Sequence, residues 1–438
     1  MRINWFSPLP PSRTDIAQFT ARILPDLCAH AEVTLWTAQD SWDVQTATVR
    51  RFDPAHPRWD ILNQADVTIY NIGNDARFHS AFWEACRAHS GFVIMHDVSL
   101  HDSISHYHRE RGDRDGYLRI FESAYGARGR ADAERYWSGA VSNEHMVKMY
   151  SCAPYVLASS LGAIVHSGAA REALQRDLPE LPIVQLPLPY PAPDAHFAGG
   201  FVPRLHAGSP PWRLIVFGFL GVNRGLHALL AALGALSIRD RFRLDIYGEL
   251  YDRSAVSNLI HQLQLKNHVT IHGFVPEAEL EAALASAHLA VNLRYPTMGE
   301  ASGSQLRIWS HGLPSLVTRT GWYAELPQDT AAFVRPESMV EDIREHLEAY
   351  AAAPAVYAEL GEKGYRYFAQ RHSPAEYVKG ILQLAKQASL YRARVSGLYL
   401  ADRTAETLDG WFVADRLPEY IDRLAKEICA VYGFPASS

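Results

Sequence analysis

A turn rich in glycine and serine carries the residues whose chemistry is easiest to name. Glu300 stands at its lip, and a helix is expected to begin among Ser302, Gly303 and Ser304 and to end at Gly312. The first N–H groups of a helix lack partners within the helix, and the helix dipole is positive at this end, so the turn suits a phosphate group. A plain βαβ crossover without a ligand fits the same stretch equally well.

Two further polar residues follow expected strands. Arg224 comes after a loop bounded by glycines, where a cation can neutralise a departing diphosphate. The alternative is a surface arginine at the start of a helix. His96 and its neighbour Asp97 follow another strand, at the edge where the sheet would open to a ligand. A core or loop histidine and a turn-capping aspartate are the alternatives here.

Two sequence patterns are weak evidence for a metal site. Asp113 and Asp115 form an Asp-x-Asp motif in a charged loop without a preceding strand, which indicates a solvated turn. Four histidines lie close in sequence, but their spacing matches no standard set of ligands: His96, His101, His106 and His108. We therefore expect no metal site.

Length and composition limit the class of protein. The 438 residues suffice for two or three domains, and 48% hydrophobic residues indicate globular units. A net charge of −6 does not favour nucleic acid, and four scattered cysteines predict free thiols. No signal peptide or long apolar span is visible, so we expect a cytoplasmic protein, with peripheral contact at the inner face of the membrane left open.

Strands alternate with helices through the first half of the chain, which predicts a parallel sheet covered by helices. Helices are expected at Asp15–His30 and Phe78–His89. The stretch Ser99–Pro154 interrupts the alternation and is expected to be a mostly helical insertion. The expected strands are Arg2–Phe6, Val33–Trp36, Val67–Asn71, Phe92–Met95, Ala163–Ser167 and Ile183–Leu188.

The second half restarts the same alternation after a linker rich in proline and glycine, Pro189–Trp212. Two doubly wound α/β units facing a cleft are therefore predicted. Their ranges are 1–205 and 212–375, and a helical segment at 376–438 is expected to pack partly back on the first unit. The expected strands of the second half are Leu214–Phe217, Arg243–Tyr247, Val269–His272, Leu289–Leu293 and Ser315–Thr318.

Several motifs of the second half resemble the retaining glycosyltransferases of the GT-B fold, in the large family numbered 4, also called glycosyl transferases group 1. The resemblance covers roughly Met1 to Gln370 and is more specific in the second half. It rests on Phe217 to Gly225, Ile246 to Gly248, Val269 to Phe274, Leu293 to Pro314 and Gly321 to Glu325, with Ser7 to Ala17, His96-Asp97 and Val165 to Ser167 in the first half.

The resemblance implies a metal-independent transfer from a nucleotide-diphosphate sugar, GDP- or UDP-linked, with no cofactor. The acceptor would be a glycan, a lipid-linked glycan or a small molecule. Glu300 and His96 would face the donor sugar, and Arg224 the leaving diphosphate. The remaining residues would serve the nucleotide or brace its loops: Gly218, Gly273, Phe274, Ser302, Gly303, Ser304 and Glu325. A nucleotide-sugar epimerase, a phosphorylase and a non-catalytic sugar- or partner-binding module are alternatives.

Three residues depart from the family pattern. Phe219 stands where an arginine is usual, and Arg307 stands near the place of a second acid. Arg307 could help to hold the diphosphate or could be structural. Asp15 replaces a glycine and is expected to cap the following helix, with a position facing the acceptor as the alternative. The insertion is expected to shape the acceptor site, with self-association, such as a homodimer, as the alternative.

Overall fold

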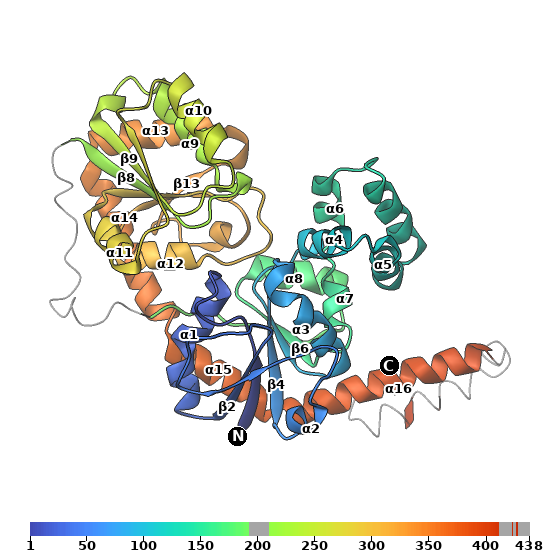
Figure 1. Ribbon diagram of the computed structural model, residues 1–438. Helices are drawn as coiled ribbons and strands as arrows, with labels where there is room; N and C mark the ends of the chain where they lie inside the picture. Colours follow the sequence, from blue (N-terminus) through green and yellow to red (C-terminus); the bar gives the residue numbers. More distant parts are fainter. Residues whose placement is uncertain (192–209, 411–422, 424–425, 428–438) are drawn as a thin grey trace. The chain divides into compact units, whose positions relative to one another are not determined.

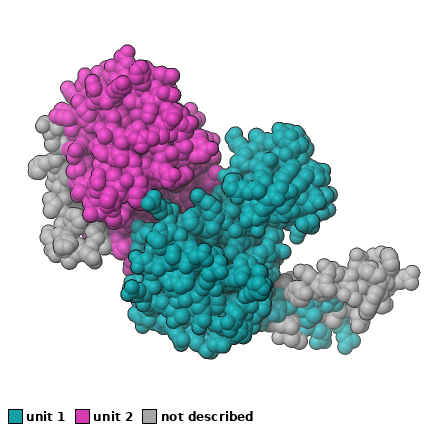
Figure 2. All heavy atoms as spheres, viewed as in Figure 1, with its two compact units in different colours: residues 1–165, 171–186, 378–438 teal, residues 166–170, 187–377 magenta. Residues whose placement is uncertain are grey.

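The computed structural model describes residues 1–191, 210–410, 423 and 426–427. Most of the predicted linker and the end of the predicted C-terminal helical segment lie outside these residues. The chain forms two compact units, coloured in Figure 2. Unit 1 comprises Met1–Val165, Arg171–Leu186 and the chain from Val378 onward, and unit 2 comprises His166–Ala170 and Pro187–Tyr377.

Unit 1 is built on a parallel sheet of seven strands in the order β3-β2-β1-β4-β5-β6-β7 (Figure 1). All four residues of β5 and of β6 are buried, as expected for strands covered on both faces. The strands are β1 (Arg2–Phe6), β2 (Glu32–Thr37), β3 (Thr48–Arg51), β4 (Val67–Ile72), β5 (Phe92–Met95), β6 (Gly162–Val165) and β7 (Ile183–Gln185).

The stretch 99–154 is helical, and its helices α4, α5 and α6 form a group of their own beside the sheet of unit 1 (Figure 1). The chain returns to unit 1 through α16, where the rings of Tyr391 and Phe92 lie 5.1 Å apart. The helices are α1 (Asp15–Cys28), α2 (Trp59–Leu62), α3 (Ala76–Ala88), α4 (His101–Glu110), α5 (Arg114–Trp137), α6 (Asn143–Met149), α7 (Ala153–Leu157), α8 (Gly168–Asp177), α15 (Pro374–Lys386) and α16 (Ala388–Gly410).

Unit 2 repeats the plan with a six-stranded parallel sheet in the order β10-β9-β8-β11-β12-β13. Its strands are β8 (Trp212–Phe217), β9 (Phe242–Tyr247), β10 (Val269–Gly273), β11 (Leu289–Asn292), β12 (Ser315–Thr318) and β13 (Ala332–Val334). Its helices are α9 (Leu226–Ala235), α10 (Arg253–Gln262), α11 (Glu277–Ser286), α12 (Gly303–Ser310), α13 (Met339–Ala352) and α14 (Pro354–Arg371).

Alternating side chains of β8 supply two cores, one on each face of the sheet of unit 2. Leu214 and Val216 join the larger cluster with α9 and α13. Ile215 and Phe217 join the smaller cluster with residues of α11 and α12, among them Ile308. Because successive residues of a strand point to opposite faces, this strand requires helices on both sides, which confirms the predicted doubly wound fold.

Three details of the fold differ from the sequence analysis. The strands β3 and β13 were not expected, since β3 is a largely exposed edge strand and β13 has only three residues. Asp15 is not the cap of α1. The cap is Thr14, whose hydroxyl accepts a hydrogen bond from the N–H of Ile16, and Asp15 is the exposed first residue of the helix. A threonine cap satisfies the same helix N–H group without a charge.

Helix α14 packs closely on the turn that ends α12. A methyl group placed on Gly361 of α14 would lie 2.2 Å from the carbonyl oxygen of Gly312 and 2.8 Å from the nitrogen of Pro314. Both neighbours are backbone atoms, which cannot rotate away. The glycine therefore fixes the far end of α12.

We expect Gly361→Ala to lower the melting temperature by about 3–10 °C, because the added methyl group overpacks a backbone contact. Gly303→Ala is the matched control, since a methyl group there meets no heavy atom within 4 Å. Differential scanning calorimetry of both variants tests the contact. Equal melting temperatures for the two variants would contradict it.

Candidate functional site

A buried polar network fixes the N-terminus of α12. Ser302 caps the helix, and its hydroxyl accepts a hydrogen bond from the N–H of Gln305 at 3.1 Å. The amide of Asn292, at the end of β11, donates to Ser302 at 3.3 Å and to Oε1 of Gln305 at 3.1 Å. Gln305 in turn donates to the hydroxyl of Ser315 in β12 at 2.8 Å. The helix thus begins at a position set by two strands.

The next residues of the helix leave room for a ligand. Gly303 and Ser304 are within the first turn, where backbone N–H groups point out of the helix. A methyl group on Gly303 would meet no heavy atom within 4 Å. An anion placed here would meet N–H donors and the positive end of the helix dipole.

Arg224 lies at the same place. Its side chain is 7% exposed, and Nη2 donates to the carbonyl of Phe217 at 3.3 Å, which draws the guanidinium to the end of β8. Gly218 follows β8 with a φ of 108°, and a methyl group on it would lie 3.2 Å from Nη2 of Arg224 and 3.8 Å from Oγ of Ser304. The glycine therefore opens a space bordered by a cation and by the start of α12.

Glu300 is held within its own loop. Its Oε1 forms an ion pair with Nε of Arg294 at 2.8 Å. Its Oε2 accepts from the hydroxyl of Thr297 at 2.9 Å and from the N–H of Met298 at 2.6 Å. Glu300 thus braces the turn and stands two residues before the cap of α12. Sequence analysis missed Arg294, although its place directly behind a strand was a usable signal.

Gly273 ends β10 and Phe274 follows it, at the same edge of the sheet. Gly273 has a φ of 75°, a conformation that favours glycine, and a methyl group there would meet no heavy atom within 4 Å. Phe274 is 66% exposed. An open glycine beside an exposed ring leaves room for a flat ligand. The role of these two residues toward the nucleotide stays a prediction.

Glu325 braces unit 2. Its carboxylate accepts from the N–H of Gly168 at 2.9 Å and of Ala169 at 2.6 Å, at the start of α8, and these residues belong to unit 2. A carboxylate at a helix N-terminus is favoured by the dipole. The arrangement agrees with the bracing role that the resemblance implies.

Arg307 lies in the last turn of α12 and points to α11. Its Nε donates to Oε1 of Glu281 at 2.9 Å, and Nη2 pairs with Glu277 at 2.7 Å. His311 binds the other oxygen of Glu281 at 2.7 Å. These contacts engage Arg307 with α11 and support its structural alternative over the predicted role in holding the diphosphate.

The ion pairs on α11 should make stability depend on pH. The hydrogen bond from His311, with help from Arg307, lowers the pKa of Glu281 from 4.5 to about 2. Because the folded-state pKa lies below the unfolded value, the stabilisation is complete above about pH 4.5 and is lost as the pH falls toward 2.

We expect Glu281→Gln to reduce the fall in unfolding free energy between pH 5 and pH 3, measured by urea denaturation. The exposed Glu279→Gln on the same helix is the matched control and should keep the wild-type slope. A slope unchanged in Glu281→Gln would show that the carboxylate is not held by these partners.

His96 lies in unit 1 at the end of β5. Its Nε2 lies 3.0 Å from Oδ1 of Asn71, and the Asn71 amide donates to the carbonyl of Phe6, so the imidazole Nε2 is the donor. The ring of Phe19 packs edge-on at 4.7 Å. Asp97 accepts from the N–H of Asn74 at 2.8 Å and so ties the loop after β4. The predicted meeting of His96 with Glu300 of unit 2 stays a prediction.

Two of the other histidines in the predicted cluster, His101 and His108, bind groups within the insertion. His101 lies 2.9 Å from the hydroxyl of Tyr117, and His108 lies 2.9 Å from Asp113, which also caps α5. Within the part of the chain that the structure describes, no group of three or more His, Cys, Asp or Glu side chains is arranged to hold a metal ion.

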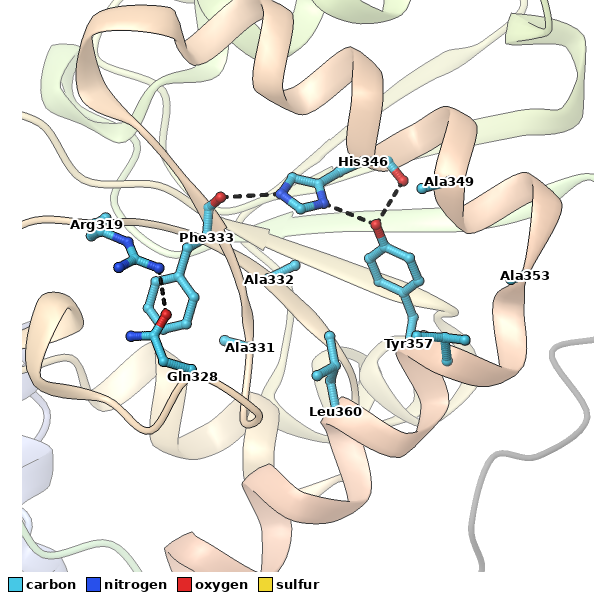
Figure 3. Close-up of a pocket in the computed structure, with 11 residues that line it drawn as sticks. Arg319, Gln328, Ala331, Ala332, Phe333, His346, Ala349, Ala353, Tyr357 and Leu360 are labelled. Atoms are coloured by element: carbon cyan, nitrogen blue, oxygen red, sulfur yellow. Dashed lines mark hydrogen bonds between the residues drawn. The ribbon is translucent and has the colours of Figure 1, made fainter.

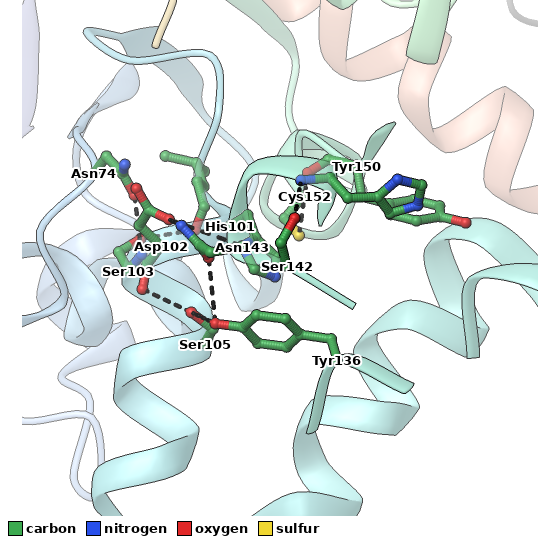
Figure 4. A network of polar contacts seen from close by, with 12 residues as sticks. Asn74, His101, Asp102, Ser103, Ser105, Tyr136, Ser142, Asn143, Tyr150 and Cys152 are labelled. Carbon is green, nitrogen blue, oxygen red and sulfur yellow. Dashed lines mark hydrogen bonds and ion pairs between the residues drawn. The ribbon is translucent and has the colours of Figure 1, made fainter. Parts of the chain in front are cut away.

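A second polar network joins the insertion to the sheet of unit 1 (Figure 4). Oδ1 of Asn74, behind β4, accepts from the N–H of Ser103 at 3.0 Å. Asp102 accepts a hydrogen bond from the amide of Asn143 at 2.7 Å. The hydroxyl of Tyr136 donates to Oδ1 of Asn143 at 3.2 Å. The helices α4, α5 and α6 are therefore held at the edge that carries His96.

A surface pocket of about 530 Å³ lies elsewhere in unit 2, beside β13 (Figure 3). Its polar groups bind one another. His346 bridges the hydroxyl of Tyr357 and the carbonyl of Phe333, and Arg319 donates to Gln328. None of the predicted site residues lines this pocket.

Comparison with solved structures shows the class of fold. HepE from Anabaena in complex with UDP matches with a TM-score of 0.58 at 13% identity, over 88% of this chain and 100% of that one. Sucrose-phosphate synthase from Thermosynechococcus elongatus matches with a TM-score of 0.58 at 17% identity, over 88% of this chain and 98% of that one. WaaG, a glycosyltransferase involved in lipopolysaccharide biosynthesis, matches with a TM-score of 0.54 at 15% identity, over 86% and 98% of the two chains. The fold is that of the GT-B proteins, as predicted.

The family match is narrower and falls on the candidate site. Residues 205–367 match the family model described as glycosyl transferases group 1. The matched residues lie within the main span of unit 2, Pro187–Tyr377, which holds the start of α12 and Arg224. Comparison with curated protein sequences gives no match. In the described residues, no helix is both long and apolar enough to cross a membrane.

Proposed function

We propose that this protein is a retaining glycosyltransferase that moves a sugar from a nucleotide diphosphate to a glycan, a lipid-linked glycan or a small-molecule acceptor. The observation that carries the proposal is the start of α12, where Arg224 and Ser304 border an open space beside Gly218. Charge, N–H donors and room for an anion coincide there, within the matched domain.

The donor class follows from the site and its relatives. Structures of HepE with this fold are described as complexes with UDP and with UDP-glucose, which supports a UDP-linked sugar over a GDP-linked one. The exposed ring of Phe274 and the open backbone at Gly273 would take the base. The lipopolysaccharide role given for WaaG supports a glycan or lipid-linked acceptor.

In the proposed reaction, the chain supplies charge and position. Arg224 and the first N–H groups of α12 stabilise the negative charge that develops on the departing diphosphate, so no divalent metal ion is required. Glu300 would accept a hydrogen bond from a hydroxyl group of the donor sugar. His96, whose donor nitrogen is fixed by Asn71, would face the sugar from unit 1. Attack on the same face, with the leaving phosphate taking the proton of the acceptor, would retain the anomeric configuration.

The diphosphate site is tested by calorimetric titration with UDP, GDP, ADP and dTDP. We expect one of them to bind, and Arg224→Ala to weaken it about 10- to 100-fold, because a charge-assisted hydrogen bond is lost. The affinity of Arg224→Lys for the nucleotide should fall between those of wild type and Arg224→Ala. Arg319→Ala, an arginine at the same sheet edge that binds Gln328, is the matched control. Wild-type affinity in Arg224→Ala would refute the assigned role.

Activity is tested by following the donor without an acceptor. A transferase should hydrolyse the preferred UDP-sugar slowly, at a rate unchanged by EDTA. We expect His96→Ala to lower kcat while the dissociation constant of UDP stays within about two-fold, since His96 is assigned to the sugar and not to the phosphates. Sugar isomers in place of free sugar would identify an epimerase, and no turnover with any acceptor would favour a binding module.

A further inference from the structure

We infer that Arg294 is a second ligand for the diphosphate. Glu300 holds Arg294 before the donor arrives and releases it to the diphosphate when the donor binds. The inference rests on the proposed function, because it concerns the same site. Its starting point is the ion pair of 2.8 Å between Nε of Arg294 and Oε1 of Glu300, at the lip of the turn that leads into α12.

Arg294 lies on the side of the sheet where α12 begins. Asn292, two residues earlier, points to Ser302 and Gln305 of α12. Leu293 points to the opposite face of the sheet, where it packs in the larger core cluster with residues of α9 and α13. Its Cβ would lie 2.9 Å from a methyl group on Gly225, the residue before α9. Since side chains alternate along an extended segment, Arg294 starts on the same side as Asn292. The N–H of Arg294 donates to the hydroxyl of Thr318 at 3.0 Å, which fixes its backbone.

The charges at this edge of the sheet single out Arg294. A nucleoside diphosphate carries more than one negative charge, and one arginine does not neutralise it. In the described loops that directly follow β8 to β13, four arginines occur: Arg224, Arg294, Arg319 and Arg335. Arg319 binds Gln328 and stacks on Phe333, and Arg335 pairs with the buried Asp342. Arg224 and Arg294 follow the adjacent strands β8 and β11.

Phe219 strengthens this argument. It directly follows Gly218, at the border of the open space, and its ring is 62% exposed. A phenyl ring supplies no charge to a phosphate. The loop after β8 therefore contributes Arg224 as its cation, and a second cation has to come from another loop.

The contacts of Glu300 allow the exchange. Oε2 keeps its two donors, the Thr297 hydroxyl and the Met298 N–H, when Arg294 turns to a phosphate. Oε1 is then open to a hydroxyl of the donor sugar. A guanidinium has five N–H donors, so Arg294 can bind a phosphate in bidentate fashion once it leaves Glu300. The donor would thus gain a cation at its diphosphate and an acceptor at its sugar in one step.

The experiment separates this role from simple bracing of Glu300. Arg294→Gln keeps a hydrogen-bond donor for Glu300 but removes the charge. UDP and UMP are titrated calorimetrically into wild type, Arg294→Gln, Glu300→Gln and the control Arg319→Gln, with melting temperatures recorded for each. If another nucleotide binds wild type best, its diphosphate and monophosphate replace UDP and UMP.

We expect Arg294→Gln to reduce the preference for the diphosphate over the monophosphate by about ten-fold, because the lost cation acts on the phosphates. Glu300→Gln should increase that preference, since it frees Arg294 and removes a negative charge. Arg319→Gln should leave it unchanged. A wild-type preference in Arg294→Gln, with its melting temperature intact or lowered, overturns the inference. Absence of any nucleotide binding to wild type would instead overturn the proposed function.

Discussion

The position of α12 depends on hydrogen bonds that are closed to water. Asn292, Ser302, Gln305 and Ser315 are all buried, and together they join the ends of β11 and β12 to the first turn of the helix. A buried polar group without a partner costs about 1–3 kcal/mol, so such a network tolerates one arrangement and resists others. The N–H groups that we assign to the phosphate therefore do not need to be organised when the ligand binds.

Much of this site could be predicted from the sequence because its parts are local. Few residues separate the strand before Glu300, the cap at Ser302 and the end of the helix at Gly312. Residues that start and stop a helix can be recognised from the neighbouring sequence. Arg224 and Gly218 were found for the same reason. The alternation of strands and helices was also sufficient to predict two doubly wound units.

What the sequence did not show depends on distance or on exposure. The partners of Arg307 lie 26 and 30 residues upstream on another helix, so its structural role was invisible. The pairing of Arg294 with Glu300 depends on how the five residues between them fold. The edge strand β3 carries mostly exposed side chains and so lacks the alternation of a half-buried strand. Asp15 was taken as the cap because aspartate is a preferred cap and a helix follows it, but the cap lies one residue earlier, at Thr14.

The route of the chain through the two units has a consequence for dissecting the protein. Unit 2 is almost one uninterrupted span, Pro187–Tyr377, whereas unit 1 draws on segments from both sides of it. Tyr391 and Arg392 of α16 reach back to Phe92 and to the carbonyl of Asp66. A fragment cut after residue 186 would lose these contacts at the amino ends of β4 and β5. The span Pro187–Tyr377 can therefore be exchanged as one piece, but unit 1 has to be expressed from two pieces or with its ends rejoined.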